Sequence, residues 1–148
     1  MTFATIDRAF ISFARKYDIT FGFFSLFVVY AWFGALKVLG LSPASPLVLA
    51  LLAKTMPGFP PETFMPLFGL FEVTIGILFL VPRAVRVTIA LMAAHMCMVF
   101  LPLILLPGMT WTGLFVPTLE GQYIIKNVVL LALALTIVAG TKPVAAKK

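Results

Sequence analysis

Charged side chains are scarce in this sequence. Of its 148 residues, only 11% are Asp, Glu, Lys or Arg, whereas 62% are hydrophobic, and the mean hydropathy is +1.13. A water-soluble fold could not cover this much apolar surface with so few charges. The composition therefore predicts a protein whose solvent is largely lipid.

Cysteine and histidine are almost absent, since the chain has one of each, Cys97 and His95. A lone cysteine excludes a disulfide or a CxxC redox pair within one chain, and a lone histidine excludes a two-histidine haem site. We therefore expect no metal site and no intrinsic cofactor. Acidic residues are also few, and the net charge is +6. The basic residues flank apolar runs rather than gathering on a soluble surface, so we expect no nucleic-acid partner.

Long apolar runs are abundant, and four of them can cross a bilayer as helices. They cover residues 20–41, 62–81, 85–106 and 118–139. About 20 helical residues span the roughly 30 Å of hydrocarbon in a membrane. Before the first run, apolar side chains recur at helical spacing opposite basic ones, which predicts an amphipathic helix in the membrane interface over residues 1–18. The expected fold class is an all-α membrane protein: residues 1–148 form one integral domain, a bundle of four transmembrane helices.

Local signals predict how these spans are joined. The apolar segment 47–56 is too short to span and predicts a short helix in the first long connection. The short turn at residues 82–86 forces spans 2 and 3 to be antiparallel neighbours. Pro102 removes a backbone bond to Met98 and should kink span 3, and Thr118 is a plausible N-cap for span 4. Trp111 suits a membrane interface.

The distribution of basic residues predicts the orientation of the spans. With both termini on one side, that side carries eight Lys and Arg residues outside the spans, and the other side carries only Lys54. Positive charge accumulates on the cytoplasmic side of membrane proteins, so we expect both termini to be cytoplasmic. The eight residues are Arg8, Arg15, Lys16, Arg83, Arg86, Lys142, Lys147 and Lys148.

Ionisable residues inside the spans form the candidate site. Glu72 is the only charge in the apolar run 67–81, and glycines share its helical face. Charges within hydrocarbon are costly, so they are expected to pair. By helical rise, Glu72 and Lys126 each lie roughly 10 Å below the outer surface, and Lys37 lies about one turn from the outer end of span 1. We expect a buried network of these three residues, extended outward by Tyr123, Asn127 and Glu120.

Each of these residues also has a purely structural interpretation. A Glu–Lys pair can hold helices together without binding anything, and Lys37 can simply extend its side chain to the headgroups. By helical rise, His95 lies deeper than the network, where a neutral side chain bonded to a backbone carbonyl is the expected arrangement, with proton transfer as the secondary one. Cys97 is expected to be inert packing.

Several short motifs resemble the DoxX-like family of small four-helix bacterial membrane proteins. They are residues 32–37 (WFGALK), residues 71–76 (FEVTIG), the Pro82-Arg83 turn and, more weakly, Lys126-Asn127. The resemblance implies a four-helix bundle in the bacterial inner membrane. It also implies a link to quinone-coupled sulfur oxidation, as a small subunit of thiosulfate:quinone oxidoreductase, or to oxidative-stress defence. The family has no universal catalytic set to transfer to this chain.

Three functions remain open at this stage. The first is a subunit that binds a quinone-like molecule, with Lys37 and Lys126 as donors, Glu72 handling a proton, and Tyr123 and Trp32 as aromatic walls. The second is a structural or assembly scaffold, and the third is a proton-coupled transporter that uses Glu72 and His95. We expect the bilayer, further redox subunits and additional copies of the chain as partners. The sequence does not identify an enzyme activity.

Overall fold

The computed structural model describes residues 2–141 and is almost entirely helical. Within that range, four helical segments are long and apolar enough to cross a membrane: Phe3–Val38, Pro61–Phe79, Pro82–Leu105 and Leu119–Ala139. The mainly helical architecture and the four helices that could span a membrane are thus confirmed, consistent with the expected all-α membrane protein. The basic tail with Lys142, Lys147 and Lys148, which contributed to the predicted orientation, lies outside the described residues.

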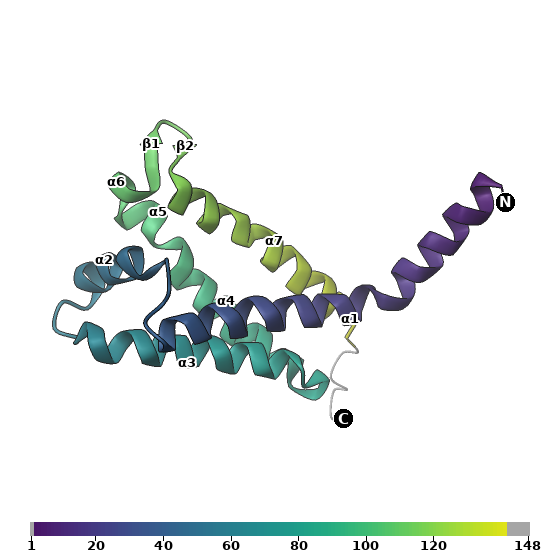
Figure 1. Cartoon of the computed structure of the whole chain (residues 1–148), viewed down its shortest axis with the longest axis horizontal. Helices are drawn as coiled ribbons and strands as arrows, with labels where there is room; N and C mark the ends of the chain where they lie inside the picture. The colour runs from purple at the N-terminus through teal and green to yellow at the C-terminus, as the bar shows by residue number, and fades with distance from the viewer. Residues whose placement is uncertain (1, 142–148) are drawn as a thin grey trace, which may run out of the picture.

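Helix α1 (Phe3–Val38) combines two elements that the sequence predicted as separate. No proline or glycine lies between residues 3 and 21, so nothing in this stretch ends the helix. The Asp18 carboxylate accepts a hydrogen bond from the N–H of Ile19 at 2.6 Å, a local competitor of the helical bonds. Figure 1 shows that α1 changes direction along its length and that its N-terminal arm extends beyond the bundle. At 1.5 Å per residue α1 is about 54 Å long, so it cannot lie wholly within a bilayer core.

Helices α2 and α3 follow the sequence closely. The short helix expected in the first connection is α2 (Ser45–Thr55), and α3 (Pro61–Phe79) begins with a proline at its first position. A single 3₁₀ turn, η1 (Pro82–Ala84), then leads into α4 (Val85–Phe100). Because this turn is so short, α3 and α4 pack as antiparallel neighbours, as predicted.

Pro102 interrupts the third span, as predicted. Helix α4 ends at Phe100, and α5 (Pro102–Leu105) continues after a break at Leu101, whose N–H bonds to Met98 O at 3.3 Å. The next segment is α6 (Pro107–Thr110), followed by strands β1 (Trp111–Gly113) and β2 (Val116–Pro117), which pair antiparallel. The sequence did not predict this hairpin. Thr118 then caps α7 (Leu119–Ala139) by accepting the Gly121 N–H at 3.1 Å, which confirms it as the N-cap.

Among the described residues, α1 and α3 make the most extensive contact between two helices, and their backbones approach closely at three glycines. A Cβ atom built on Gly34 would lie 2.6 Å from Gly69 O, and one on Gly69 would lie 2.6 Å from Gly34 O. Two helical turns further along α3, a Cβ on Gly76 would lie 2.7 Å from the backbone nitrogen of Ala31. Side chains larger than hydrogen would separate the two helices here, so the glycines are a packing requirement. We call this contact the α1–α3 seam.

Helices α4 and α7 pack against α1 and α3 and complete the bundle. A core of large apolar side chains joins all four spans, and α7 packs against α1 and α4. Figure 1 shows the arm of α1 and the end of α7 at one end of the bundle, while α2, α5 and the β1–β2 hairpin lie at the other. An even number of passes returns the chain to the side on which it started. The main core residues are Leu26, Tyr30, Ile75, Phe79, Met92, Met96 and Ile137.

Candidate functional site: a buried polar cluster

Lys37 and Glu72 form a buried ion pair across the α1–α3 seam. The Lys37 ammonium donates to Glu72 Oε2 at 2.6 Å, and each residue is only 6% exposed. The pairing follows from the seam: Gly69 stands one turn before Glu72, Gly34 stands one turn before Lys37, and both let the backbones approach. The predicted pair of Lys37 with Glu72 is therefore present.

His95 joins this pair from α4. Its Nε2 lies 3.0 Å from Glu72 Oε1, and its Nδ1 lies 3.2 Å from the hydroxyl of Tyr30 on α1. The expectation that His95 bonds to a backbone carbonyl, below the network, is wrong, because both ring nitrogens meet side chains of the network itself. Depth counted along one helix did not predict which side chains His95 would meet, because that depends on how α4 packs against α1 and α3.

Tyr30 is the member that the sequence analysis left out of the site. It is buried, and it shares one face of α1 with Gly34 and Lys37 at a spacing of four and seven residues. That spacing was a usable signal, because residues four and seven apart on a helix face the same neighbour. We call Lys37, Glu72, His95 and Tyr30 the polar cluster.

The hydrogen bonds of the polar cluster are consistent with one arrangement of protons. An ionised carboxylate only accepts, so Nε2 of His95 donates to Glu72; with a neutral imidazole, Nδ1 then accepts from the Tyr30 hydroxyl. The Lys37 ammonium and the Glu72 carboxylate then offset each other, and the cluster carries no net charge. This neutrality matters because an uncompensated charge in a low-dielectric interior is costly. Among residues 2–141, no buried side-chain nitrogen or oxygen is left without a partner.

Aromatic rings surround the charged end of the polar cluster. The ring of Phe68 stacks on the His95 imidazole with 5.4 Å between centroids, and Lys37 Nζ lies 5.5 Å from the centre of the same ring. Phe64, one turn earlier on α3, stacks on Phe68 with 5.5 Å between ring centroids. The ring centroid of Phe71 lies 6.1 Å from that of His95. A cation over an aromatic face is an attractive contact, and it strengthens when water is excluded.

The polar residues of α7 do not join the cluster, which corrects the predicted Glu72–Lys126 pair. Lys126, Glu120 and Tyr123 are exposed, with Tyr123 at 62%, and Lys126 Nζ lies 5.3 Å from the centre of the Tyr123 ring. Asn127 is half-buried and donates to the backbone oxygen of Tyr123 at 3.1 Å. Depth along a helix says nothing about its rotation, and α7 turns Gly121, Ile124, Ala134 and Ile137 inward instead. We call Glu120, Tyr123, Lys126 and Asn127 the α7 arc.

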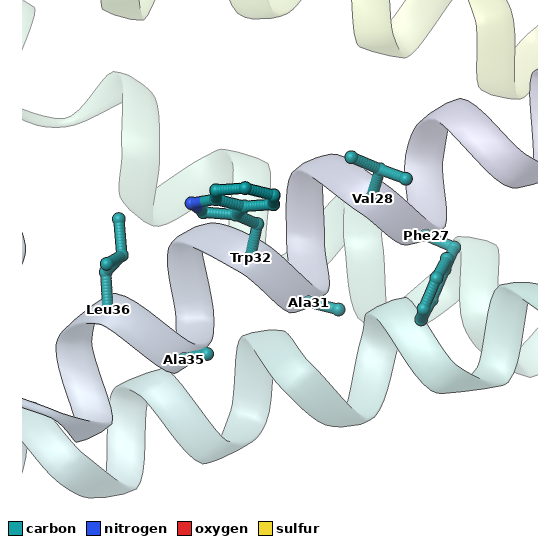
Figure 2. Close-up of a pocket in the computed structure, with 6 residues that line it drawn as sticks. All are labelled: Phe27, Val28, Ala31, Trp32, Ala35 and Leu36. Atoms are coloured by element: carbon teal, nitrogen blue, oxygen red, sulfur yellow. The ribbon is translucent and has the colours of Figure 1, made fainter.

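Trp32 also lies away from the polar cluster. Its side chain is 65% exposed and borders a shallow apolar groove of about 410 Å³ on the surface of α1. Figure 2 shows the indole among the other residues that line the groove, with Ala31 and Ala35 along the lower edge in this view. Tyr30, Gly34 and Lys37 occupy a different face of the helix, so Trp32 is not an aromatic wall of the site. The other lining residues are Phe27, Val28 and Leu36.

Within residues 2–141, no three His, Cys, Asp or Glu side chains gather closely enough to hold a metal ion. The single cysteine, Cys97, is a free thiol on the exposed side of α4. Comparisons of this chain with family models, with curated proteins and with solved structures found no match.

Proposed function

We propose that this protein is a membrane subunit that binds a quinone-like molecule, an apolar compound with a carbonyl oxygen, at the polar cluster. The observation that carries the proposal is the unused donor capacity of Lys37. An ammonium has three N–H groups, and this one has a single acceptor, Glu72 Oε2, among the residues described. A buried cation with two donors to spare fits a ligand carbonyl as its next acceptor.

The surroundings of Lys37 support this assignment. Phe68 presents a ring to both Lys37 and His95, and such a ring can stack on a flat conjugated ligand. Glu72 fixes the ammonium, His95 fixes Glu72, and Tyr30 fixes His95, so the donor is held in place before a ligand binds. A bound quinone would supply the redox chemistry, and electrons would come from a partner subunit.

The setting of this function is a further part of the proposal. The basic residues favour an orientation with both termini in the cytoplasm. The resemblance to the DoxX-like family implies that the membrane is a bacterial inner membrane. The N-terminal arm of α1 then lies along the cytoplasmic interface, with its exposed phenylalanines in lipid. Membership of the DoxX-like family rests on the motifs around Lys37 and Glu72 quoted above.

A pair of matched variants tests the ligand site. Lys37→Met with Glu72→Gln removes both charges but keeps side-chain volume and leaves an amide for His95. We expect the wild-type protein in nanodiscs to be thermally stabilised by a short-chain quinone in a saturable way, and the double variant to fold but lose this shift. Lys126→Met with Glu120→Gln removes the same charges from the α7 arc and should keep the shift. Unaltered binding by the Lys37/Glu72 variant would refute the proposal.

A structural role is the second candidate. It is favoured because every buried side-chain nitrogen or oxygen among residues 2–141 has at least one partner within the protein. In that case the polar cluster only fixes how α1, α3 and α4 associate. The same double variant separates the two functions in cells. A well-folded Lys37→Met/Glu72→Gln protein that retains its cellular phenotype supports the structural role, and one that loses the phenotype supports the ligand site.

A further inference from the structure

The β1–β2 hairpin presents two apolar side chains at its tip. Leu114 is 88% exposed and Phe115 is 85% exposed, which makes them two of the most exposed large apolar residues described. They form the two-residue loop between Gly113 and Val116, which pair across the hairpin. An exposed apolar tip of this kind normally contacts something, because water solvates it poorly.

Hydrogen bonds hold the hairpin rigidly on the end of the bundle. The Trp111 indole N–H donates to Leu103 O at 3.0 Å, which ties β1 to α5. The Thr118 hydroxyl donates to Met109 O at 2.7 Å, and the Thr118 N–H donates to Thr110 O at 3.0 Å. Beyond the hairpin, a side chain on Gly121 would collide with the backbone oxygen of Thr110. The tip is therefore held in a fixed position rather than on a free loop.

The backbone at the tip is strained in a way that favours glycine. Phe115 has a φ of +57°, in the left-handed region that residues other than Gly, Asn and Asp rarely adopt. Such a conformation is unfavourable for a bulky residue and persists only where the surrounding structure holds it. A phenylalanine here places a ring at the tip although its backbone conformation is unfavourable. This indicates that the ring itself has a role.

We propose that Leu114 and Phe115 insert into the lipid interface beside the bundle and anchor the ends of α5 and α7 there. Residues 107–119 include no charged side chain that would pair with a protein partner or with water-exposed charges. In Figure 1 the hairpin projects sideways from the end of the bundle, away from α1 and α3. This direction would keep its tip beside the ends of the spans, at the level that the proposal assigns to the membrane surface. Ile104 on α5 and Leu119 on α7, which flank the hairpin, are also exposed and continue the apolar surface onto the spans. Lipid is the occupant that fits this position.

Site-specific fluorescence measures the environment of the tip directly. In a Cys97→Ser background, Leu114→Cys or Phe115→Cys carries an environment-sensitive label, and the protein is placed in nanodiscs. Gly58→Cys is the matched control, because it lies in the other long connection with open space around it. We expect iodide to quench labels at 114 and 115 severalfold less than the label at 58. Lipids brominated near the glycerol should quench 114 and 115 but not 58.

Each alternative occupant gives a different result. Labels at 114 and 115 that iodide quenches as strongly as the label at 58 would place the tip in water and overturn the proposal. Protection from iodide without quenching by brominated lipid would mean that another protein surface, such as a second copy, covers the tip, and would also overturn it. Thermal unfolding of each labelled variant shows whether the fold is intact. If Phe115→Cys is unstable, Leu114→Cys carries the test alone.

Discussion

The polar cluster and the α7 arc contain the same chemistry in opposite surroundings. Each has a lysine, a glutamate and a tyrosine. In the cluster these are Lys37 and Tyr30 on α1 and Glu72 on α3, and in the arc they are Lys126, Glu120 and Tyr123 on α7. The first set is buried and linked by short hydrogen bonds, whereas the second is exposed on one helix. These three residue types are common to both regions, and Glu72 and Lys126 were expected at the same depth, so neither property distinguishes the two regions.

Glycine makes the difference between these regions. The α1–α3 seam brings two backbones together at Gly34, Gly69 and Gly76, and the Lys37 and Glu72 side chains on the same helical faces are buried there. On α7 the glycine that meets a neighbour is Gly121, and it faces the hairpin end rather than another span. A charge inside a span is thus more informative when small residues share its helical face than when depth alone is known.

The largest expected effect comes from removing the carboxylate at the centre of the cluster. Glu72→Ala leaves Lys37 as an uncompensated buried cation and His95 without an acceptor, so we expect a loss of about 3–5 kcal/mol in unfolding free energy. Glu120→Ala removes the same group from the α7 arc and should change stability little. Denaturant unfolding in detergent micelles measures both. Adding Lys37→Met to Glu72→Ala should restore part of the loss, since it removes the stranded charge. Equal effects of Glu72→Ala and Glu120→Ala would contradict the comparison.

The seam itself can be broken without touching a charge. Gly34→Ala places a methyl group against backbone atoms of α3 that cannot move aside as side chains do. Overpacking of this kind costs about 1–3 kcal/mol, and we expect the Lys37–Glu72 pair to be disturbed with it. Gly58→Ala, where a Cβ would meet nothing within 4 Å, is the control and should be neutral or slightly stabilising. Thermal unfolding of the two variants in one detergent makes the comparison, and a neutral Gly34→Ala would refute close backbone contact.

These contrasts also show what the sequence could and could not predict. Hydrophobic runs, prolines and the Thr118 cap predicted the helices, because those signals act within one segment. Glu72, Gly69 and Gly76 on one face predicted close approach by a neighbour, and Lys37 is the partner found there. The rotation of α7 and the place of His95 depend on how whole helices pack, which no single segment encodes. The β1–β2 hairpin was missed because it is short and its Leu-Phe tip lacks the usual glycine or asparagine.

Tyr30 provides a smaller test of the cluster. Tyr30→Phe removes only the hydroxyl that meets Nδ1 of His95 and keeps the ring in the core. A buried acceptor without a partner costs about 1–3 kcal/mol, so this variant should be less stable by that amount. Tyr123→Phe, which removes the hydroxyl of an exposed tyrosine, should be within error of the parent. If denaturant unfolding gives the same small change for both variants, the Tyr30–His95 bond contributes nothing to stability.

The smallest expected effect concerns the lysine of the α7 arc. Lys126 is exposed on a span and lies about 10 Å along the helix from its start, so its ammonium can extend to the interface at little cost. Lys126→Met should therefore change unfolding free energy by less than about 0.5 kcal/mol, whereas Lys37→Met should destabilise strongly because it strands Glu72. Unfolding of dilute protein in detergent measures both variants. A loss at Lys126 comparable with that at Lys37 would mean that the α7 arc has a partner outside the chain. A loss that vanishes on dilution would identify that partner as a second copy.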